Sequence, residues 1–242
     1  MAESPSNETP VALVTGAGRG IGAATSRALA GIGYRLALLG RTRSRLEAVA
    51  ESLPDSATPL VLPVDLGDDV GCADAIGRID AAFGRIDVVV NNAGVAPQRS
   101  IGETDAQLLR ETLETNLVGP VVLVATAWPL LLRSRGCVVN VSSMASIDPF
   151  RGFTAYAASK SGLDSLTRSI MAEADDSGIR AFTLNPGVVE TDLLRSLFDE
   201  SMVPRGSALS PEQVADEVVA CIGGDRDHRV GTHHPLLPDS DS

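Results

Sequence analysis

The sequence has 242 residues, of which 44% are hydrophobic and 21% are charged, and its net charge is −11. This is the composition of an ordinary globular protein with enough apolar residues for a sizeable core. The excess of acidic residues disfavours nucleic acid and anionic membranes as partners, because both repel a negatively charged protein.

The start of the chain and its cysteines indicate a cytoplasmic protein. Residues 1–9 are polar and lack the apolar stretch of a signal peptide, so we expect a disordered lead-in. The three cysteines, Cys72, Cys137 and Cys221, are odd in number and far apart. They suggest neither a disulfide framework nor a zinc site. The most apolar long stretch, residues 118–132, contains Gly and Pro and is too short to span a bilayer, which favours a buried helix.

Short apolar runs alternate with amphipathic segments along most of the chain. The runs, which are rich in Val and Leu and predict buried strands, are 11–16, 35–40, 59–65, 87–94, 137–143 and 179–187. The segments with helical spacing are 21–32, 44–52, 70–83, 106–132 with a break near Gly119-Pro120, 155–175 and 211–222. This alternation predicts an α/β fold: one domain, residues 10–224, with a doubly wound parallel (Rossmann-like) sheet and helices on both faces. Residues 225–242 are expected to form an irregular tail.

The first predicted strand runs into a glycine-rich loop. The residues expected to bind a cofactor there are Gly16, Ala17, Gly18, Arg19, Gly20, Ile21 and Gly22. Glycines allow positive φ and the close approach of a pyrophosphate, and the following helix offers free N–H groups to phosphate. Because the loop follows a strand and opens a helix, we expect a dinucleotide. A purely structural tight turn is the alternative.

The end of the second predicted strand indicates which dinucleotide. NAD sites of this kind place an acid there for the ribose 2′-hydroxyl, whereas this chain has Gly40 and Arg41. Arg41 can bind a 2′-phosphate, and Arg19 can approach the same group. The sequence therefore predicts NADP as the preferred cofactor, with NAD possible. The alternative is a solvated helix face that includes Arg43 and Arg45.

Lys160 is the single lysine among 20 basic residues, and it follows Tyr156, one of two tyrosines, by four positions. On a helix this spacing places both side chains on one face. An ammonium group nearby lowers the pKa of a phenol and is compact enough to bond ribose hydroxyls beneath it. The pair therefore predicts a general acid–base. An exposed pair on an ordinary helix is the alternative.

Together the motifs resemble the short-chain dehydrogenase/reductase family over about residues 10–222. They are TGAGRGIG, NNAG at 91–94, ETNLVG around Asn116, VNVSS, YAASK and NPGVVET, in the order of that family. The resemblance implies that Tyr156 is the acid–base and that Ser143 bonds the reacting oxygen. It also implies that Lys160 binds the nicotinamide ribose and lowers the Tyr156 pKa, and that Asn116 bends its helix and holds a water near Lys160.

The same resemblance implies further cofactor contacts. Asp65, with Leu66 beside it, would accept a bond from the adenine amino group, and three residues would line the adenosine ribose: Asn92, Ala93 and Gly94. Four residues would hold the carboxamide: Pro186, Gly187, Val189 and Thr191. Taken singly, each has a structural alternative, such as a helix cap for Asp65, a turn residue for Asn116 or a strand-end hydroxyl for Ser143.

The last part of the chain departs from the family pattern. The usual final strand is expected to be missing or degenerate, and His228, His233 and His234 are expected to lie in a solvated tail without a metal. Residues 192–208 are expected to form a mobile substrate flap. Its apolar residues, with Phe150 and Phe153, would face a moderately apolar substrate or pack in the core; they are Leu193, Leu194, Leu197 and Phe198.

The sequence therefore predicts an NADP(H)-dependent oxidoreductase for a small carbonyl or secondary alcohol substrate. A catalytically idle NADP-binding sensor or scaffold on the same fold is the alternative. The chain is too short for the extra domain of sugar-nucleotide epimerases, and its charge disfavours an acidic acyl carrier protein. By family resemblance, the helices 106–134 and 155–175 are expected to form the interface of a homodimer or homotetramer.

Overall fold

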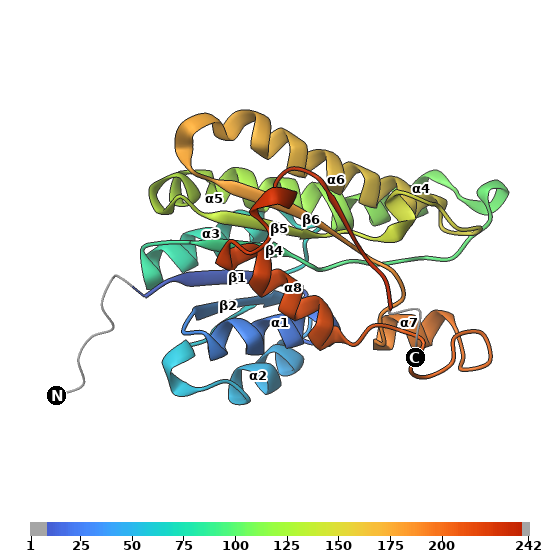
Figure 1. Cartoon of the computed structure of the whole chain (residues 1–242), viewed down its shortest axis with the longest axis horizontal. Helices are drawn as coiled ribbons and strands as arrows, with labels where there is room; N and C mark the ends of the chain where they lie inside the picture. Colours follow the sequence, from blue (N-terminus) through green and yellow to red (C-terminus); the bar gives the residue numbers. More distant parts are fainter. Residues whose placement is uncertain (1–8, 239–242) are drawn as a thin grey trace.

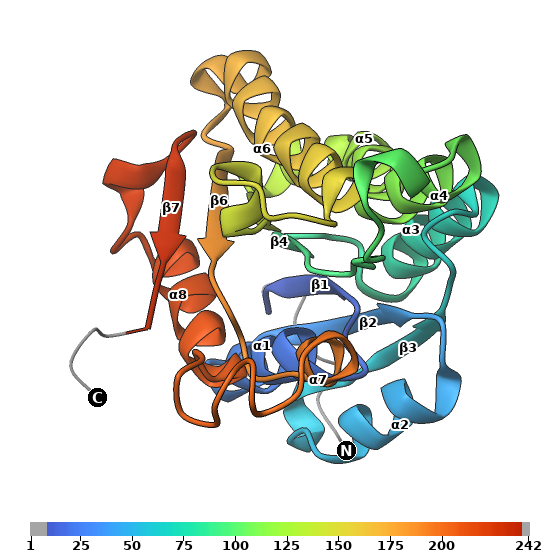
Figure 2. The same cartoon turned by 90° about the vertical axis from the view of Figure 1, so that its right-hand side faces the viewer.

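The computed structural model describes residues 9–238, so the predicted lead-in, except for its last residue, and the last four residues of the tail lie outside the described part of the chain. Within it, seven strands form one sheet in the order β3-β2-β1-β4-β5-β6-β7 (Figures 1 and 2). All neighbouring strands are parallel. The strands are β1 (Val11–Thr15), β2 (Arg35–Gly40), β3 (Leu60–Pro63), β4 (Val88–Asn91), β5 (Cys137–Val141), β6 (Arg180–Pro186) and β7 (His233–Leu236). The predicted doubly wound parallel sheet is confirmed.

Helices cover both faces of the sheet (Figure 1). One face carries α1 (Gly20–Gly31), α2 (Arg43–Glu51) and α8 (Pro211–Gly223), and the other carries α3 (Asp69–Phe83), α5 (Gly119–Ser134) and α6 (Thr154–Ala174). Successive residues of a strand point to opposite faces, so Val89 joins the core beneath α3 and α5 while Val90 joins the core beneath α1. Burial on both faces explains why the strands are continuously apolar.

The break expected near Gly119 is a local change of helix type. Helix α4 (Ala106–Leu113) continues through a π-helical segment, Glu114–Val118, into α5. Pro120, which has no N–H to donate, comes two residues after this π-helical segment, where the regular helical hydrogen bonding is already interrupted. By length and composition alone, 106–134 is the one helix within residues 9–238 that could cross a membrane. In this fold 44% of its most apolar window is buried, and α5 packs against α3.

The last strand was expected to be missing or degenerate, within an irregular tail of residues 225–242, and this is wrong for His233–Leu236, which form β7. β7 pairs in parallel with β6, from Thr183 opposite His233 to Pro186 opposite Leu236. It lies at the edge of the sheet, where one side of the strand needs no ladder bonds, so the edge tolerates Pro235 and a polar sequence. This is why β7 lacks the apolar pattern of the other strands. The histidines do not share one solvated environment either, because His234 is buried and His233 is 44% exposed at its side chain.

Candidate active site

The glycine loop has the backbone that a phosphate site requires. Gly16 and Gly20 have φ angles of 64° and 52°, which favour glycine. A Cβ on Gly22 would lie 2.3 Å from the Gly16 carbonyl oxygen, so only glycine allows α1 to start so close to β1. Arg19, at the N-cap, makes no side-chain cap, and the first turn of α1 holds no acid. The N–H groups of that turn therefore suit an anion such as a pyrophosphate.

Thr15 and Asn92 join the glycine loop to the end of β4. The Thr15 hydroxyl accepts hydrogen bonds from the backbone N–H groups of Asn92 at 2.9 Å and Ala93 at 3.0 Å. The Asn92 side chain donates to the Thr15 carbonyl at 2.9 Å. Asn92 therefore shapes the loop in addition to lining the site. Thr15 was missed by sequence reasoning; its place directly before Gly16 was the only available signal.

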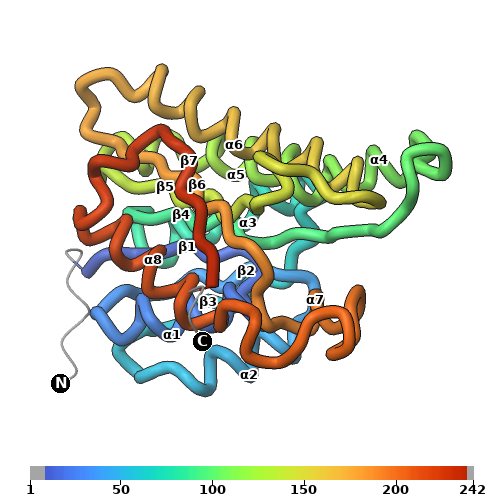
Figure 3. Tube along the Cα trace, turned by 45° about the vertical axis from the view of Figure 1, so that its right-hand side comes forward, coloured from blue at the N-terminus to red at the C-terminus, as the bar shows by residue number. Residues whose placement is uncertain are grey.

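A cavity of 980 Å³ follows the carboxyl ends of the strands, where ligands bind in open parallel sheets. Most of the predicted site residues line it, from the glycine loop through Arg41, Asp65 and Gly94 to Tyr156 and Thr191. Three of them, Ala17, Gly22 and Asn116, do not. Ala17 is buried in the core, and Gly22 packs on the loop backbone. The loop before α4 and the segment around α7 (Asp192–Leu197) lie at this end of the molecule (Figure 3).

Arginines gather where the adenosine end of a dinucleotide would lie. Arg41 follows the last residue of β2 directly and its side chain is exposed. Arg45 contacts the glycine loop, because its Cβ lies 3.0 Å from the position of a Cβ on Gly18. Arg19 lies 3.6 Å from Asp192 across the cavity mouth, and both side chains are well exposed. The Asp65 carboxylate accepts a bond from the Gly67 backbone at 3.1 Å and lines the same end. The arrangement fits an anion beside Arg41.

Ser143 and Tyr156 both line the cavity. Ser143 follows β5 and caps a short 3₁₀ turn, since its hydroxyl accepts a bond from the Ala145 N–H at 3.1 Å. Tyr156 lies in the first turn of α6. Burial raises the pKa of the Tyr156 phenol, and a side-chain hydrogen bond with Ser143 opposes that shift. Burial is the larger of these two effects, and the expected lowering of the Tyr156 pKa by Lys160 stays a prediction.

Lys160 is a buried cation beneath Tyr156. Its side chain is on the same face of α6, with Nζ 5.8 Å from the centre of the Tyr156 ring. Nζ donates to the Val141 carbonyl at 2.7 Å, and the residue is 3% exposed. Burial lowers the pKa of Lys160 to about 8, and the negative charge of Asp164 acts in the opposite direction. Lys160 therefore loses its proton at a lower pH than an exposed lysine does, and is mainly protonated at pH 7.

Asn116 lies behind the cavity wall in the π segment. Its Oδ1 accepts from the Val95 N–H, and its Nδ2 donates to the Val95 carbonyl and to the Ser159 hydroxyl, each at 2.9 Å. A Cβ on Gly94 would lie 3.4 Å from the Asn116 Oδ1 and 3.6 Å from the Lys160 Nζ. The fold thus brings Asn116 near Lys160, in a distorted helix. A water held between them stays a prediction.

Asn185, on β6, connects the 3₁₀ turn that follows Ser143 to residues that sequence reasoning missed. Its amide donates to the Ser146 hydroxyl at 3.0 Å and lies 3.4 Å from the Ser143 carbonyl oxygen. It also lies 3.3 Å from the Asp164 carboxylate, and its oxygen accepts from the His234 N–H at 3.0 Å. Asn185 stands directly before the predicted Pro186, and Asp164 is one helical turn after Lys160. These positions, next to predicted site residues, were the only features of the sequence that could have indicated Asn185 and Asp164 as part of the site.

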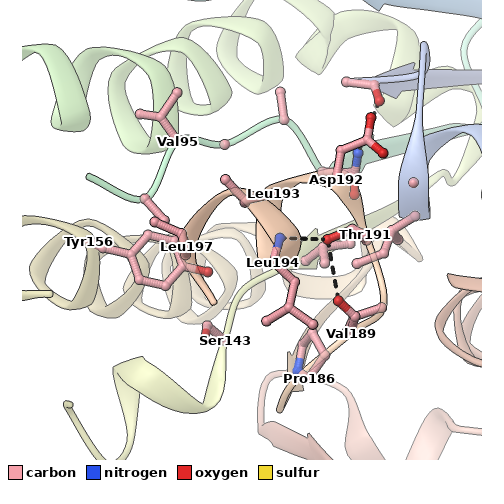
Figure 4. A pocket seen from close by; sticks show the side chains of 18 of the residues that line it. Val95, Ser143, Tyr156, Pro186, Val189, Thr191, Asp192, Leu193, Leu194 and Leu197 are labelled. Carbon is pink, nitrogen blue, oxygen red and sulfur yellow. Dashed lines mark hydrogen bonds between the residues drawn. The ribbon is translucent and has the colours of Figure 1, made fainter. Parts of the chain in front are cut away.

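A β-bridge joins the residues on either side of the segment that was expected to be a mobile flap, and hydrogen bonds within the segment hold its shape. Val189 and Leu209 form a β-bridge, and Leu209 donates its N–H to the Val188 carbonyl at 2.9 Å. Thr191 caps α7 by accepting from the Leu194 N–H at 3.2 Å, and it donates to the Val189 carbonyl (Figure 4). Arg195 pairs with Glu190 and donates to the Val203 carbonyl at 2.8 Å. The cavity therefore has a preformed wall here.

Comparison with known proteins agrees with this architecture. Residues 10–201 match the family model of short chain dehydrogenases. An uncharacterized oxidoreductase of Staphylococcus saprophyticus is 32% identical, over 76% of this chain and 80% of that protein. Meso-2,3-butanediol dehydrogenase of Serratia marcescens is 30% identical, over 95% and 93% of the two chains. The solved structure of a 3-ketoacyl-(acyl-carrier-protein) reductase from Brucella melitensis, complexed with NADH, superposes with a TM-score of 0.89 at 23% identity, over 98% and 100%.

Proposed function

The chain belongs to the short chain dehydrogenase family, oxidoreductases that act on CH–OH or C=O groups with NAD(P), and we propose that it prefers NADP(H) and reacts through Ser143, Tyr156 and Lys160. The observation that carries the proposal is the shared cavity. One continuous space joins a glycine loop built for a pyrophosphate to the hydroxyls of Ser143 and Tyr156, with Lys160 beneath them. Its volume of 980 Å³ is at the upper end for ligand sites and suits a cofactor together with a substrate.

The side chains at the catalytic end supply hydrogen bonds and a proton. When bound, the nicotinamide cofactor supplies or accepts the hydride. The Ser143 hydroxyl and the Tyr156 phenol can both donate to one carbonyl oxygen of a substrate, because both line the same wall. As that oxygen gains negative charge, Tyr156 transfers its proton to it. The raised pKa of Tyr156 keeps the phenol protonated at neutral pH, which is the form that reduction needs.

Lys160 and Asn116 hold this arrangement in place. The Lys160 ammonium would bond the ribose hydroxyls below the phenol, and its bond to the Val141 carbonyl fixes its position. Asn116 ties the Val95 backbone to Ser159, whose hydroxyl donates to the Tyr156 carbonyl at 2.7 Å. Oxidation of an alcohol is the reverse reaction and needs the phenolate, so it should be favoured at higher pH.

The preference for NADP rests on Arg41, with Arg19 and Arg45 nearby. A guanidinium binds a phosphate monoester with charge-assisted hydrogen bonds, and the residue at the end of β2 is not an acid that would repel it. The NADH complex of the Brucella reductase shows that NAD-type cofactors are used on this fold, so the two cofactors must be compared directly. The substrate would be a small carbonyl or alcohol, as the name of the Serratia relative indicates for that enzyme.

The test is a screen of ketones, aldehydes and secondary alcohols that follows the absorbance of the reduced cofactor, with NADPH and NADH in parallel. We expect turnover of some substrates, with a higher kcat/KM for NADPH than for NADH. Turnover that is equal with both cofactors would remove the NADP preference. Binding of NADP(H) without turnover of any substrate would instead favour the idle sensor or scaffold.

A further inference from the structure

Half of the protein's aromatic residues gather at the catalytic end of the cavity. The chain has five Phe, two Tyr and one Trp. Phe153 is the centre of one cluster: its ring centroid is 6.1 Å from that of Phe150, 6.2 Å from that of Tyr156 and 6.1 Å from that of Phe198. These four side chains line the cavity and come from the loop before α6, from α6 and from the end of α7. In a protein with only 3% aromatic residues, this concentration distinguishes the site.

Core packing does not account for all of these rings. Phe153 is 4% exposed and has the burial of a core residue, whereas Phe150 is 51% exposed although it contacts Phe153 and lines the cavity. A large ring left half exposed beside a cavity is typical of a surface that binds an apolar ligand. The geometry also leaves Phe150 available for a ligand ring, because its contact with Phe153 is edge-on, with an interplanar angle of 85°.

Apolar side chains from α7, and from two further segments that follow β6 and β7, line the same cavity. Leu193 and Leu197 on α7 project into the cavity that Ser143 and Tyr156 also face (Figure 4). Val188, after β6, and Leu237, after β7, line it as well while being 38% and 60% exposed. Four separate parts of the chain therefore present apolar surface around the reacting groups. Such convergence is expected of a ligand site, since a folding core would bury these side chains.

Apart from Lys160, the charged side chains near this end are on the exposed loop before α6. Among the described lining residues, the arginines and acids of the cofactor end are Arg19, Arg41, Arg45, Asp65 and Asp192. At the catalytic end, Asp148 and Arg151 are the charged lining residues besides Lys160, and both are exposed on the loop before α6. A substrate carboxylate or phosphate buried next to the leucines of α7 would lose its hydration without gaining an opposite charge there.

We propose that the substrate is a ketone, or the corresponding secondary alcohol, that carries an uncharged aromatic group, and that this group lies against Phe150, Phe198 and the leucines of α7. The inference rests on the proposed function, because it assigns the substrate class of the same site. In reduction, the carbonyl carbon gains a hydride from the reduced nicotinamide cofactor and the oxygen gains the proton of Tyr156, so the aromatic group itself does not react.

Three methyl ketones test the substrate class. 4-Methylacetophenone carries the aromatic group, 4-acetylbenzoate replaces its ring methyl by a carboxylate, and butan-2-one lacks the ring. With NADPH, we expect kcat/KM for 4-methylacetophenone to exceed the value for each of the other two by about thirtyfold or more, roughly the factor expected for burying a side chain of that size. The ring methyl group donates electrons weakly and an ionised carboxylate is nearly neutral, so the intrinsic reactivity of the carbonyl does not favour 4-methylacetophenone.

Two variants test where the aromatic group of the substrate binds. Phe150→Ala and Phe198→Ala should each raise KM for 4-methylacetophenone about tenfold, while KM for butan-2-one changes less than twofold. Val70→Ala removes an equally apolar but distant side chain, which is 79% exposed on α3, and should change neither value. Because Phe150 is half exposed, its truncation should leave the fold intact, and far-UV circular dichroism checks this.

The outcomes separate this inference from the proposed function. If butan-2-one or 4-acetylbenzoate reacts as efficiently as 4-methylacetophenone, or if both Phe variants behave like the parent, the substrate class is wrong although the enzyme is active. If no compound reacts, including those of the wider screen with NADPH and NADH, the proposed function fails, and calorimetry with the NADP⁺-loaded protein tests the aromatic site. Binding of 4-methylacetophenone that is weakened by Phe150→Ala supports the aromatic site, and no binding overturns it.

Discussion

The Asp164 carboxylate on α6 lies 3.2 Å from Nδ1 of His233 on β7, and this contact joins the last strand to the helix that contains Tyr156 and Lys160. Asp164 is 3% exposed and is one helical turn from Lys160, whose pKa it raises. Asn185 bonds the same carboxylate and also contacts the turn that carries Ser143. A short polar network therefore connects the edge strand to the turn that carries Ser143.

We predict that Asp164→Ala reduces both stability and turnover. It leaves buried Asn185 without a strong acceptor and His233 without its partner, so the free energy of unfolding should fall by about 1–3 kcal/mol. It also loosens the support of the Ser143 turn, so kcat should fall more than KM changes. Urea unfolding and steady-state kinetics measure the two effects. Asp74→Ala, at an exposed position on α3, is the control. A stability equal to that of the parent would show that the network contributes nothing.

The single lysine allows a direct test of the site's electrostatics. In a protein labelled with ¹⁵N at the lysine side chain, one Nζ signal should appear, and it should titrate near pH 8, well below the ordinary value of 10.5. Asp164→Asn should move this midpoint lower, since it removes the nearby negative charge. A midpoint above 10 would mean that Lys160 is not buried as described.

The same pKa predicts a gain in stability when Lys160 is removed. Below pH 8 both the folded and the unfolded states carry the charge, so the cost of burying it is fully present. Between pH 8 and 10.5 the unfolded state binds more protons, so the stability of the parent rises with pH. Lys160→Met should therefore be more stable at pH 7 by up to about 3 kcal/mol, less the lost bond to Val141, with the gain vanishing above pH 10.5. Arg168→Met, an exposed change on α6, should show no such pH dependence.

Tyr156→Phe should lower kcat by several powers of ten, because it removes the proton donor but no cofactor contact at the phosphates. The other tyrosine supplies the matched control: Tyr34→Phe, away from the cavity, should retain parental activity. Lys160→Arg keeps a positive charge but places it differently, and should also lose most turnover. Dissociation constants for NADP(H) should stay close to the parent value in Tyr156→Phe. An active Tyr156→Phe enzyme would disprove the catalytic assignment.

Arg41→Ala should weaken NADP(H) selectively. The loss should be about 1.5–3 kcal/mol, which is the contribution of a hydrogen bond to a charged group, and NAD(H) affinity should change little. Arg43→Ala is the matched control, because Arg43 lies two residues further on and pairs with Glu47 at 3.5 Å. Titration calorimetry with both cofactors distinguishes the variants. An equal loss for both arginines would indicate a diffuse electrostatic effect.

A dimer built on α5 and α6 is the last prediction. Val121 and Leu132 of α5 are 39% and 43% exposed, and Trp128 is only partly buried, so this helix keeps apolar surface outside the core. We expect light scattering at micromolar concentration to give the mass of at least two chains. Leu132→Arg should shift it to one chain, whereas Ile32→Arg, at a site that is 54% exposed next to α1, should not. A monomeric parent would contradict the prediction.

Local patterns were enough to predict most of the fold. The six apolar runs match β1 to β6 within a few residues, because strands buried on both faces need continuous Val and Leu. The helical spacing placed Tyr156 and Lys160 on one face of α6, and the glycine loop placed the start of α1, since both depend on backbone geometry over a few residues. Most of the predicted cofactor residues follow the carboxyl ends of these strands, and they line one cavity.

The tertiary structure decided what depends on distant neighbours. β7 could not be recognised from its residues, because an edge strand that contains Pro235 is stabilised by pairing with β6 and not by an apolar pattern of its own. The contact of Asp164 with His233 spans 69 positions in the sequence and exists only because β7 is in place. Spacing along the helix indicated that Lys160 is near Tyr156, but not that burial by the surrounding chain raises the pKa of the phenol.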